Sequence, residues 1–274
     1  MKLEQIFSVS LIYASIRSAT PIIYAALCAA ITQQADILNI GTEGIMLTGA
    51  FAAVAVSYFS GSWLMGILAA MMAGFVISGI MAVGHIKYKA DICAIGINLF
   101  ALAITKFMLN VIFDTSGTFT DSDVKAIPRM DIPFIKNIPI LKDIFNDWAV
   151  TEWFMIVLIL ILTFLLYRTR WGLRLRAVGQ FPMAAQTAGI NVISMKYQAI
   201  LISGLVGGLA GAHLSLGYST MFTENMTSNR GFMGVAAMYF GHANPALTAV
   251  GCLVFGVADS VGARLQAYGL PSQF

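Results

Sequence analysis

Polar and charged side chains interrupt several long apolar stretches of this chain, and their positions need a chemical reason. The interruptions read QQADILNIGTEG (33–44) and TMFTENMTSNRG (220–231), and they hold Asp36, Glu43, Glu224 and Arg230. An ionisable group at the centre of a bilayer costs on the order of 3 kcal/mol. Interrupted helices expose backbone N–H and C=O groups with which transporters hold solutes. A plainer role as helix caps fits too, because Glu43 and Arg230 each precede an apolar run, and both interpretations stay open.

Amide side chains near these interruptions suit a neutral, hydroxyl-rich solute, which needs donors and acceptors rather than fixed charge. Asn98 lies within the apolar run ICAIGINLF, where its amide binds either a solute or a neighbouring helix. We predict that six residues face a solute path near the junction of two halves of the molecule: Asn39, Glu43, Asn98, Glu224, Asn225 and Arg230.

The sequence carries no motif for covalent chemistry. Its three cysteines lie far apart in apolar runs, as buried small hydrophobes do, and its three histidines are scattered rather than arranged as a proton relay. It also lacks GxxxxGK[ST], the phosphate-binding loop of many ATPases. We therefore expect no catalytic residue, metal site or cofactor in this chain, and any ATP and Mg²⁺ to be used by a partner protein.

Composition places the chain in a membrane. Hydrophobic residues make up 58% of the 274 residues, charged residues make up 11%, and the mean hydropathy is +0.81. Soluble domains carry about a quarter charged residues and have too little interior for so much apolar surface. These values exclude a soluble enzyme, a disordered chain and a nucleic-acid-binding protein.

The apolar runs predict an all-α polytopic membrane protein with about eight or nine membrane helices or half-helices. One run, 231–242, is too short to span alone and is a candidate half-helix. The predicted spans are 8–31, 44–60, 63–84, 92–113, 149–167, 197–217 and 246–263.

Charge in the connecting loops predicts the orientation. Loop 168–196 holds five basic residues and no acid, so we expect it to be cytoplasmic. Loop 114–152 holds seven acids against four bases and is expected to be external. Counting spans back from these loops places the N-terminus outside.

The cytoplasmic loop is longer than a membrane turn requires. Its run PMAAQTAG offers helix formers between Pro182, a favoured first helical residue, and Gly189, a helix stop. The arginines alone fit a positive-inside anchor, but an ordered helix behind them favours a docking element for a soluble partner. We predict that docking involves Arg174, Arg176, Gly179, Pro182, Ala184, Ala185 and Gly189.

Two repeats bear on the architecture. Residues 204–211 read GLVGGLAG and contain two overlapping GxxxG pairs, which favour close helix packing within the subunit over a subunit interface. Segments 39–50 (NIGTEGIMLTGA) and 225–236 (NMTSNRGFMGVA) both place a charged residue before Gly-apolar-Met. The helices that lead into them have opposite directions, which is the pattern of an inverted repeat.

The stretch LRLRAVGQFPMAAQTAGINV (173–192) resembles the coupling region of bacterial ABC-importer permeases for nucleosides and simple sugars. Stretches 18–51, 216–237 and 269–274 match the same family in the same order, and TENMT with NRGF resembles the nucleoside branch most. Two features depart from the family pattern. Phe181-Pro182 replaces the usual Asn-Pro, and the chain stops at PSQF where relatives continue into a last helix, so it resembles a permease incomplete at its C-terminus.

The resemblance implies one permease domain over 1–274, with two inverted halves similar to vitamin B12-type importer permeases. It implies cytoplasmic ABC ATPase subunits, a second permease that is a copy or a paralogue, an extracytoplasmic solute-binding protein or lipoprotein, and a place in the bacterial plasma membrane. The implied function is nucleoside import by alternating access, powered by those ATPases. A pentose, hexose or branched-chain amino-acid permease is the alternative within the family. A self-sufficient secondary transporter or an intramembrane enzyme would belong to other classes.

Overall fold

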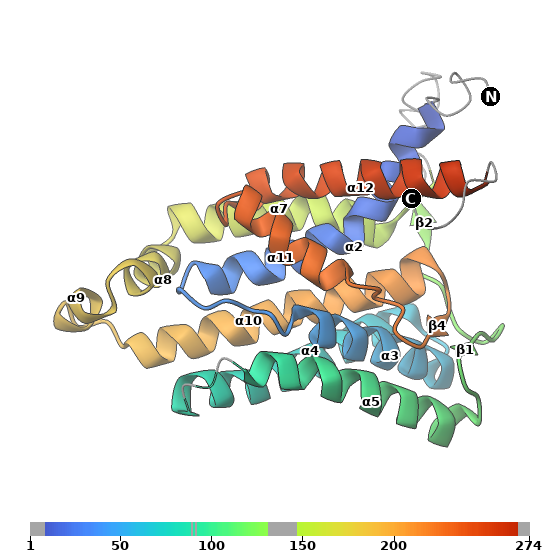
Figure 1. Ribbon diagram of the computed structural model, residues 1–274, viewed down its shortest axis with the longest axis horizontal. Helices are drawn as coiled ribbons and strands as arrows, with labels where there is room; N and C mark the ends of the chain where they lie inside the picture. The colour runs from blue at the N-terminus through green and yellow to red at the C-terminus, as the bar shows by residue number, and fades with distance from the viewer. Residues whose placement is uncertain (1–8, 89, 91, 131–146, 268–274) are drawn as a thin grey trace.

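The computed structural model describes residues 9–88, 90, 92–130 and 147–267, in which long helices run roughly side by side (Figure 1). In chain order the elements are α2 (Val9–Gln33), α3 (Thr42–Ser60), α4 (Trp63–Ala82), the π-helical turn η1 (Val83–Lys87), α5 (Cys93–Phe113), β1 (Thr118–Phe119), β2 (Arg129–Met130), β3 (Trp148–Ala149), α7 (Val150–Arg168), α8 (Arg170–Gln180), α9 (Pro182–Thr187), α10 (Val192–Ala212), the π-helical turn η2 (His213–Tyr218), β4 (Phe222–Thr223), α11 (Arg230–Phe240) and α12 (Pro245–Ala267).

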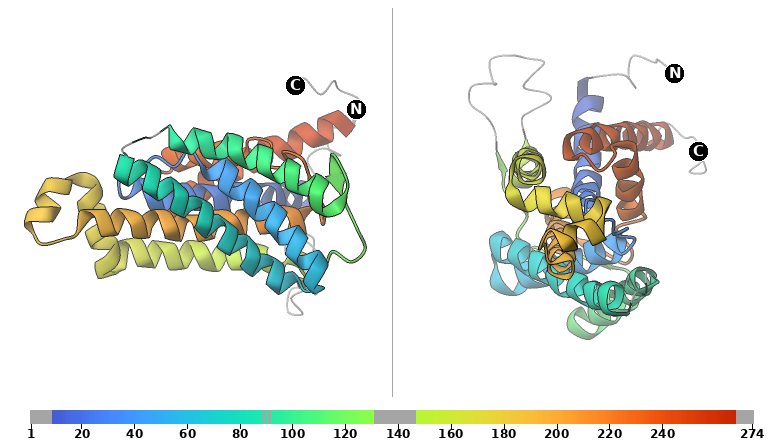
Figure 2. Two further views of the ribbon diagram at one scale, coloured as in Figure 1. Left: turned by 90° about the horizontal axis from the view of Figure 1, so that it is seen from below. Right: turned by 90° about the vertical axis from the view of Figure 1, so that its left-hand side faces the viewer.

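Every predicted span has a counterpart. Among the described residues, seven helices are long and apolar enough to cross a membrane, and the candidate half-helix 231–242 corresponds to α11. The two short antiparallel strand pairs, β1 with β4 and β2 with β3, lie at one end of the bundle. Helices α8 and α9 project from the opposite end (Figures 1 and 2). We call these the strand end and the α8–α9 end.

Helices α2, α3 and α10 form the centre of the bundle. In α2 and α10, 83% of the most apolar stretch is buried, against 22% in α5 and 28% in α12. The outer helices α4, α5, α7 and α12 turn many large apolar side chains outward. In water such a surface would drive aggregation, whereas in a bilayer it faces lipid of matching polarity. The chain is therefore built as a multi-pass membrane protein.

Glycines allow the central helices to approach closely. On one face of α10, Gly204 and Gly208 lie against Gly74 and Ala70 of α4, where an added Cβ would collide with backbone atoms. On the other face, Gly211 lies against the backbone of α3 in the same way. The prediction that the GxxxG pairs serve packing within the subunit is confirmed. In lipid, helix association depends largely on van der Waals contact, which small residues permit at short distance.

Two helices of the bundle are interrupted, and the pieces that follow run in opposite directions. After α2 the chain turns back through residues 34–41 before α3 runs to the strand end. After η2 it turns back through residues 219–229 before α11 runs toward the α8–α9 end (Figure 1). The N-termini of α3 and α11 meet inside the bundle, as the predicted inverted repeat requires.

The carboxylate of Glu43 joins these two N-termini. Glu43 belongs to the first turn of α3, yet its Oε1 accepts the backbone N–H of Asn229 at 2.9 Å and its Oε2 accepts that of Gly231 at 2.7 Å. A helix N-terminus has unpaired N–H groups and a partial positive charge, so a carboxylate is a suitable partner. Gly231 is required here, because a Cβ would lie 2.7 Å from the Cα of Glu43. Glu43 thus acts as a helix cap for the opposite half of the molecule.

Asn98 fastens α5 to the same junction. Its Oδ1 accepts the backbone N–H of Gly44 at 2.8 Å, and its Nδ2 donates to the carbonyl of Ile40 at 3.0 Å. The amide therefore caps α3 and also holds the end of the break before it. The sequence left two roles open for Asn98, binding a solute or bonding to a neighbouring helix. Its hydrogen bonds in the structure are of the second kind.

The Glu43 cap yields a stability prediction. In Glu43→Gln one acceptor oxygen must serve two N–H groups, and the charge that balances the α11 terminus is lost. We expect a loss of roughly 1–3 kcal/mol in unfolding free energy. Hydrogen exchange should also become faster at the amides of Asn229 and Gly231, relative to amides within α10.

Asp36→Asn is the matched control, because it removes one carboxylate charge from an exposed position in the neighbouring break. A Glu43→Gln protein with the same thermal midpoint and the same exchange rates as this control would contradict the capping role.

Candidate functional site

A cavity of about 370 Å³ lies where α3, α5 and α11 come together. This volume falls within the roughly 300–1,000 Å³ of small-molecule sites. It is lined by Ile40, Glu43, Gly44, Leu47, Ile95, Asn98, Leu99, Leu102, Asn225, Asn229 and Phe232. Three of the six residues predicted for a solute path, Glu43, Asn98 and Asn225, meet around this space.

The lining combines an apolar wall with a few polar groups. Leucine and isoleucine side chains from α3 and α5 form most of the wall, and the ring of Phe232 adds an aromatic surface from α11. Four polar side chains interrupt it, two carried by helices and two by the break before α11. A mostly apolar pocket with a small number of placed polar groups is the usual construction of a small-molecule site.

Two other predicted path residues lie nearby but do not line the cavity. Asn39 is 1% exposed and donates from Nδ2 to the sulfur of Cys28 at 3.6 Å, and its Oδ1 has no hydrogen-bond partner among the described residues. Arg230 begins α11, and its guanidinium donates back to the carbonyl of Met226 at 3.3 Å. The positions of Asn39 and Arg230 neither support nor contradict a role in solute movement, so that role stays a prediction for both.

Glu224, the sixth predicted residue, is held at the strand end by other groups. Its Oε1 accepts the backbone N–H of Gly117 at 2.9 Å, and its Oε2 lies 3.1 Å from the Nζ of Lys106. The Gly117 N–H and then the Lys106 ammonium hold the pKa of the Glu224 carboxyl below its ordinary value. The Glu224 carboxyl is therefore ionised at neutral pH, and the ion pair is lost as pH falls through that lowered pKa.

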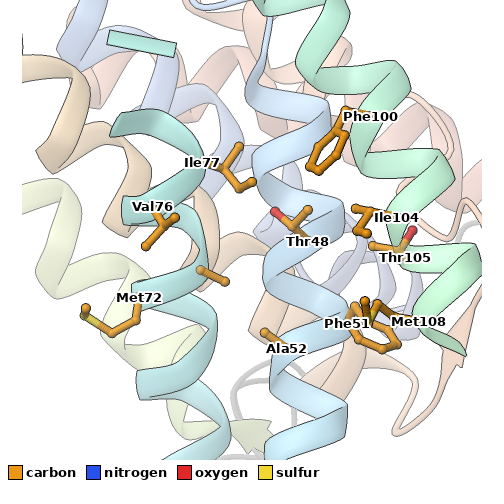
Figure 3. Close-up of a pocket in the computed structure, with 11 residues that line it drawn as sticks. Thr48, Phe51, Ala52, Met72, Val76, Ile77, Phe100, Ile104, Thr105 and Met108 are labelled. Atoms are coloured by element: carbon orange, nitrogen blue, oxygen red, sulfur yellow. The ribbon is translucent and has the colours of Figure 1, made fainter. Parts of the chain in front are cut away.

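A second hollow, of about 400 Å³, opens between α3, α4 and α5 (Figure 3). Nearly all of its lining is apolar, with Phe51, Met72 and Phe100 among the larger side chains. Its two hydroxyls are already bonded within their own helices, Thr48 to the carbonyl of Gly44 and Thr105 to that of Ala101. Such a surface offers nothing to a hydroxyl-rich solute, so the cavity beside Glu43 is the stronger candidate site.

The predicted helix in loop 168–196 is present at the α8–α9 end. Pro182 is the first residue of α9, and Gly189 follows the helix with a φ of +81°, a left-handed conformation that favours glycine. Gly179 lies against the end of α2, where an added Cβ would collide with the carbonyl oxygen of Gln34. Helix α8 is thereby seated on the first residue of the break that leads to α3.

The other predicted coupling residues divide into buried and exposed ones. Ala185 is only 4% exposed and packs inward, whereas Ala184 faces outward. The guanidinium of Arg176 stacks over the ring of Tyr167 at 4.9 Å, and Arg174 lines a cleft of about 660 Å³ between α8 and α10. The docking role of this set remains a prediction.

Sequence reasoning missed the most exposed apolar side chains of this end, which are Phe181 at 74% and Met183 at 84%. Their place beside Pro182 was a usable signal, since apolar residues at a polar loop tip need a partner. It also missed Asn229 and Phe232 in the cavity. Asn229 follows Asn225 by four residues in the same interruption, so the amide pair was visible in the sequence.

Residues 131–146 and the matched stretch 269–274 lie outside the described residues.

Comparison with known proteins gives close relatives along almost the whole chain. The guanosine ABC transporter permease protein NupQ of Bacillus subtilis is 37% identical, over 95% of this chain and 84% of the relative. The nucleoside ABC transporter permease protein NupC of Lactococcus lactis is 33% identical, over 93% and 84%. A proposed glucose ABC transporter permease of Haloferax volcanii, TsgC13, is 30% identical, over 96% and 80%.

A solved structure shares the fold. It is an ABC transporter described as metal-chelate type, in an inward-facing conformation, with a TM-score of 0.53, 14% identity, and coverage of 96% of this chain and 79% of that one. The two inverted halves predicted from the sequence agree with this architecture. The model of the family described as branched-chain amino acid transport system / permease component matches residues 11–270. The chain therefore belongs to that family of ABC transporter permeases, the membrane subunits that carry out no covalent chemistry.

Proposed function

We propose that this chain is the permease subunit of an ATP-driven importer for nucleosides. The observation that carries the proposal is the cavity beside Glu43, together with the two relatives that are permeases for guanosine and for nucleosides. A nucleoside has a planar base with apolar faces and polar edges. A cavity with an apolar wall, one phenylalanine ring and a few amides matches that distribution of polarity.

Fixed charge in the cavity also favours a neutral solute. The Glu43 carboxylate is 8% exposed and both of its oxygens accept backbone N–H groups at the positive end of α11. Its charge is therefore balanced within the protein. A cationic solute would find no unpaired carboxylate among the cavity residues, and an anionic solute would meet a carboxylate in the wall.

Transport would proceed by alternating access between two inverted halves. In this proposal the α8–α9 end is cytoplasmic and meets ABC ATPase subunits, and the strand end receives solute from an extracytoplasmic binding protein or lipoprotein. A second permease, either a copy or a paralogue, completes the pathway. ATP-driven closure of the ATPases would press on α8 and α9, and through the Gly179 contact on the end of α2.

Simple-sugar import is the second candidate, because the Haloferax relative is a proposed glucose permease. A sugar carries hydroxyls in every direction and therefore requires polar partners around most of its surface. Six of the eleven lining residues are Leu, Ile or Phe, which favours a nucleoside.

Uptake of labelled solute distinguishes these candidates. In cells or vesicles that carry the assembled transporter, we expect ATP-dependent uptake of guanosine, which excess unlabelled inosine or adenosine removes and which excess glucose, ribose or leucine leaves unchanged. Inhibition by the sugars alone would contradict nucleoside import and support the second candidate. Inhibition by leucine alone would point to an amino-acid permease.

Docking of α9 gives a second prediction. Met183→Asp places a charge on the most exposed apolar side chain of α9 and should lower solute-stimulated ATP hydrolysis at least about tenfold, since the loss of a central interface anchor costs about 2 kcal/mol or more. Ile193→Asp is the matched control, because Ile193 is 61% exposed at the start of α10, outside α9. Normal solute-stimulated hydrolysis in a Met183→Asp protein that accumulates normally would remove the docking role.

A further inference from the structure

The four polar side chains of the cavity differ in what they are bound to. Both oxygens of Glu43 and both polar atoms of Asn98 are occupied by backbone partners. The side chains of Asn225 and Asn229 make no hydrogen bond within the described part of the chain, and both residues are exposed to the cavity. The side chains whose donors and acceptors are all available to a solute are therefore these two amides, whereas Glu43 and Asn98 are already held by backbone groups.

Asn229 occupies the N-cap position of α11, but its side chain makes no capping hydrogen bond. It occupies the residue before α11, where asparagine ordinarily accepts a backbone N–H of the first turn. Here the side chain makes no such bond, and the carboxylate of Glu43 from α3 accepts the N–H groups of Asn229 and Gly231. The capping carboxylate leaves the amide of Asn229 available to a solute.

Backbone conformation alone does not account for the two asparagines. Asn225, Ser228 and Asn229 have φ values of +55°, +44° and +66°, in the left-handed region that asparagine tolerates better than most residues. Thr220 in the same break has a φ of +52°. The break thus accepts serine and threonine at positive φ, and asparagine occupies the two such positions that line the cavity.

We infer that Asn225 and Asn229 determine specificity by hydrogen bonding to the polar edge of a nucleobase, with the ring of Phe232 against the face of the base. This inference rests on the proposed function. A carboxamide offers a donor and an acceptor side by side, which complements the adjacent acceptor and donor on a purine edge. An aromatic ring stacks on any base and so adds affinity without selecting among bases.

Substitution by glycine separates the effect of the amide side chains from that of the backbone conformation. Asn225→Gly and Asn229→Gly remove the side chain without strain at positive φ, and Ser228→Gly is the matched control at a neighbouring position that does not line the cavity. In uptake by the assembled transporter, each asparagine variant should raise the KM for guanosine roughly three- to tenfold, the effect of one lost hydrogen bond. The control should keep the wild-type KM.

Asn229→Asp separates recognition from folding. It keeps the side-chain shape and the positive φ but loses the N–H donor, so the ratio of the KM values for guanosine and adenosine should change at least threefold. A purely structural role would move both KM values together. Wild-type uptake of guanosine with wild-type KM values in all three asparagine variants would overturn the inference and leave the proposed function intact. Absence of nucleoside uptake by the wild-type transporter would overturn both.

Discussion

One buried carboxylate holds the two halves of this protein together at their centre. Glu43 starts one half-helix and caps the other, so the positive ends of α3 and α11 face each other without an unbalanced field. The contact requires glycine at 231 and fixes the spacing between α3 and α11. The cavity, the course of both breaks and the freedom of the Asn229 side chain all depend on this arrangement.

The same junction is linked to the far end of the bundle by a short run of chain. Gly179 of α8 packs on Gln34, the first residue of the break, and eight residues after Gln34 α3 begins. Asn98 holds the end of that break at Ile40 and ties it to α5. A displacement of α8 therefore acts on the break 34–41, which ends at the cavity wall. Only these few residues lie between the α8 contact and the cavity. This is the physical basis for expecting a partner at α8 and α9 to influence the site.

Much of the fold could be predicted from the sequence, because lipid imposes a simple rule on composition. Long apolar runs between polar interruptions predicted all seven spans and the half-helix α11, and the GxxxG pattern predicted packing within the subunit. Pro182 and Gly189 predicted α9 for local backbone reasons.

The site was only partly predictable, because a sequence does not reveal which polar group meets which. Of the six residues predicted to face a solute path, Glu43, Asn98 and Asn225 line one cavity. Glu224 has its partners at Gly117 and Lys106, which are more than a hundred residues away along the chain. Asn229 directly precedes α11, where asparagine commonly caps a helix, and only the structure shows that its side chain makes no capping bond.

The central claim is that solute passes through the cavity between α3, α5 and α11, and cysteine protection tests it most directly. Leu99 lines the cavity and is 65% exposed, whereas Phe107, 58% exposed on the same helix, does not line it. With Cys93, the one cysteine that is not buried, replaced by serine, Leu99→Cys and Phe107→Cys are each labelled with a thiol reagent in the assembled transporter. Guanosine should slow labelling at position 99 and leave position 107 unchanged. Equal labelling rates at position 99 with and without guanosine, in a transporter that imports guanosine, would contradict the account.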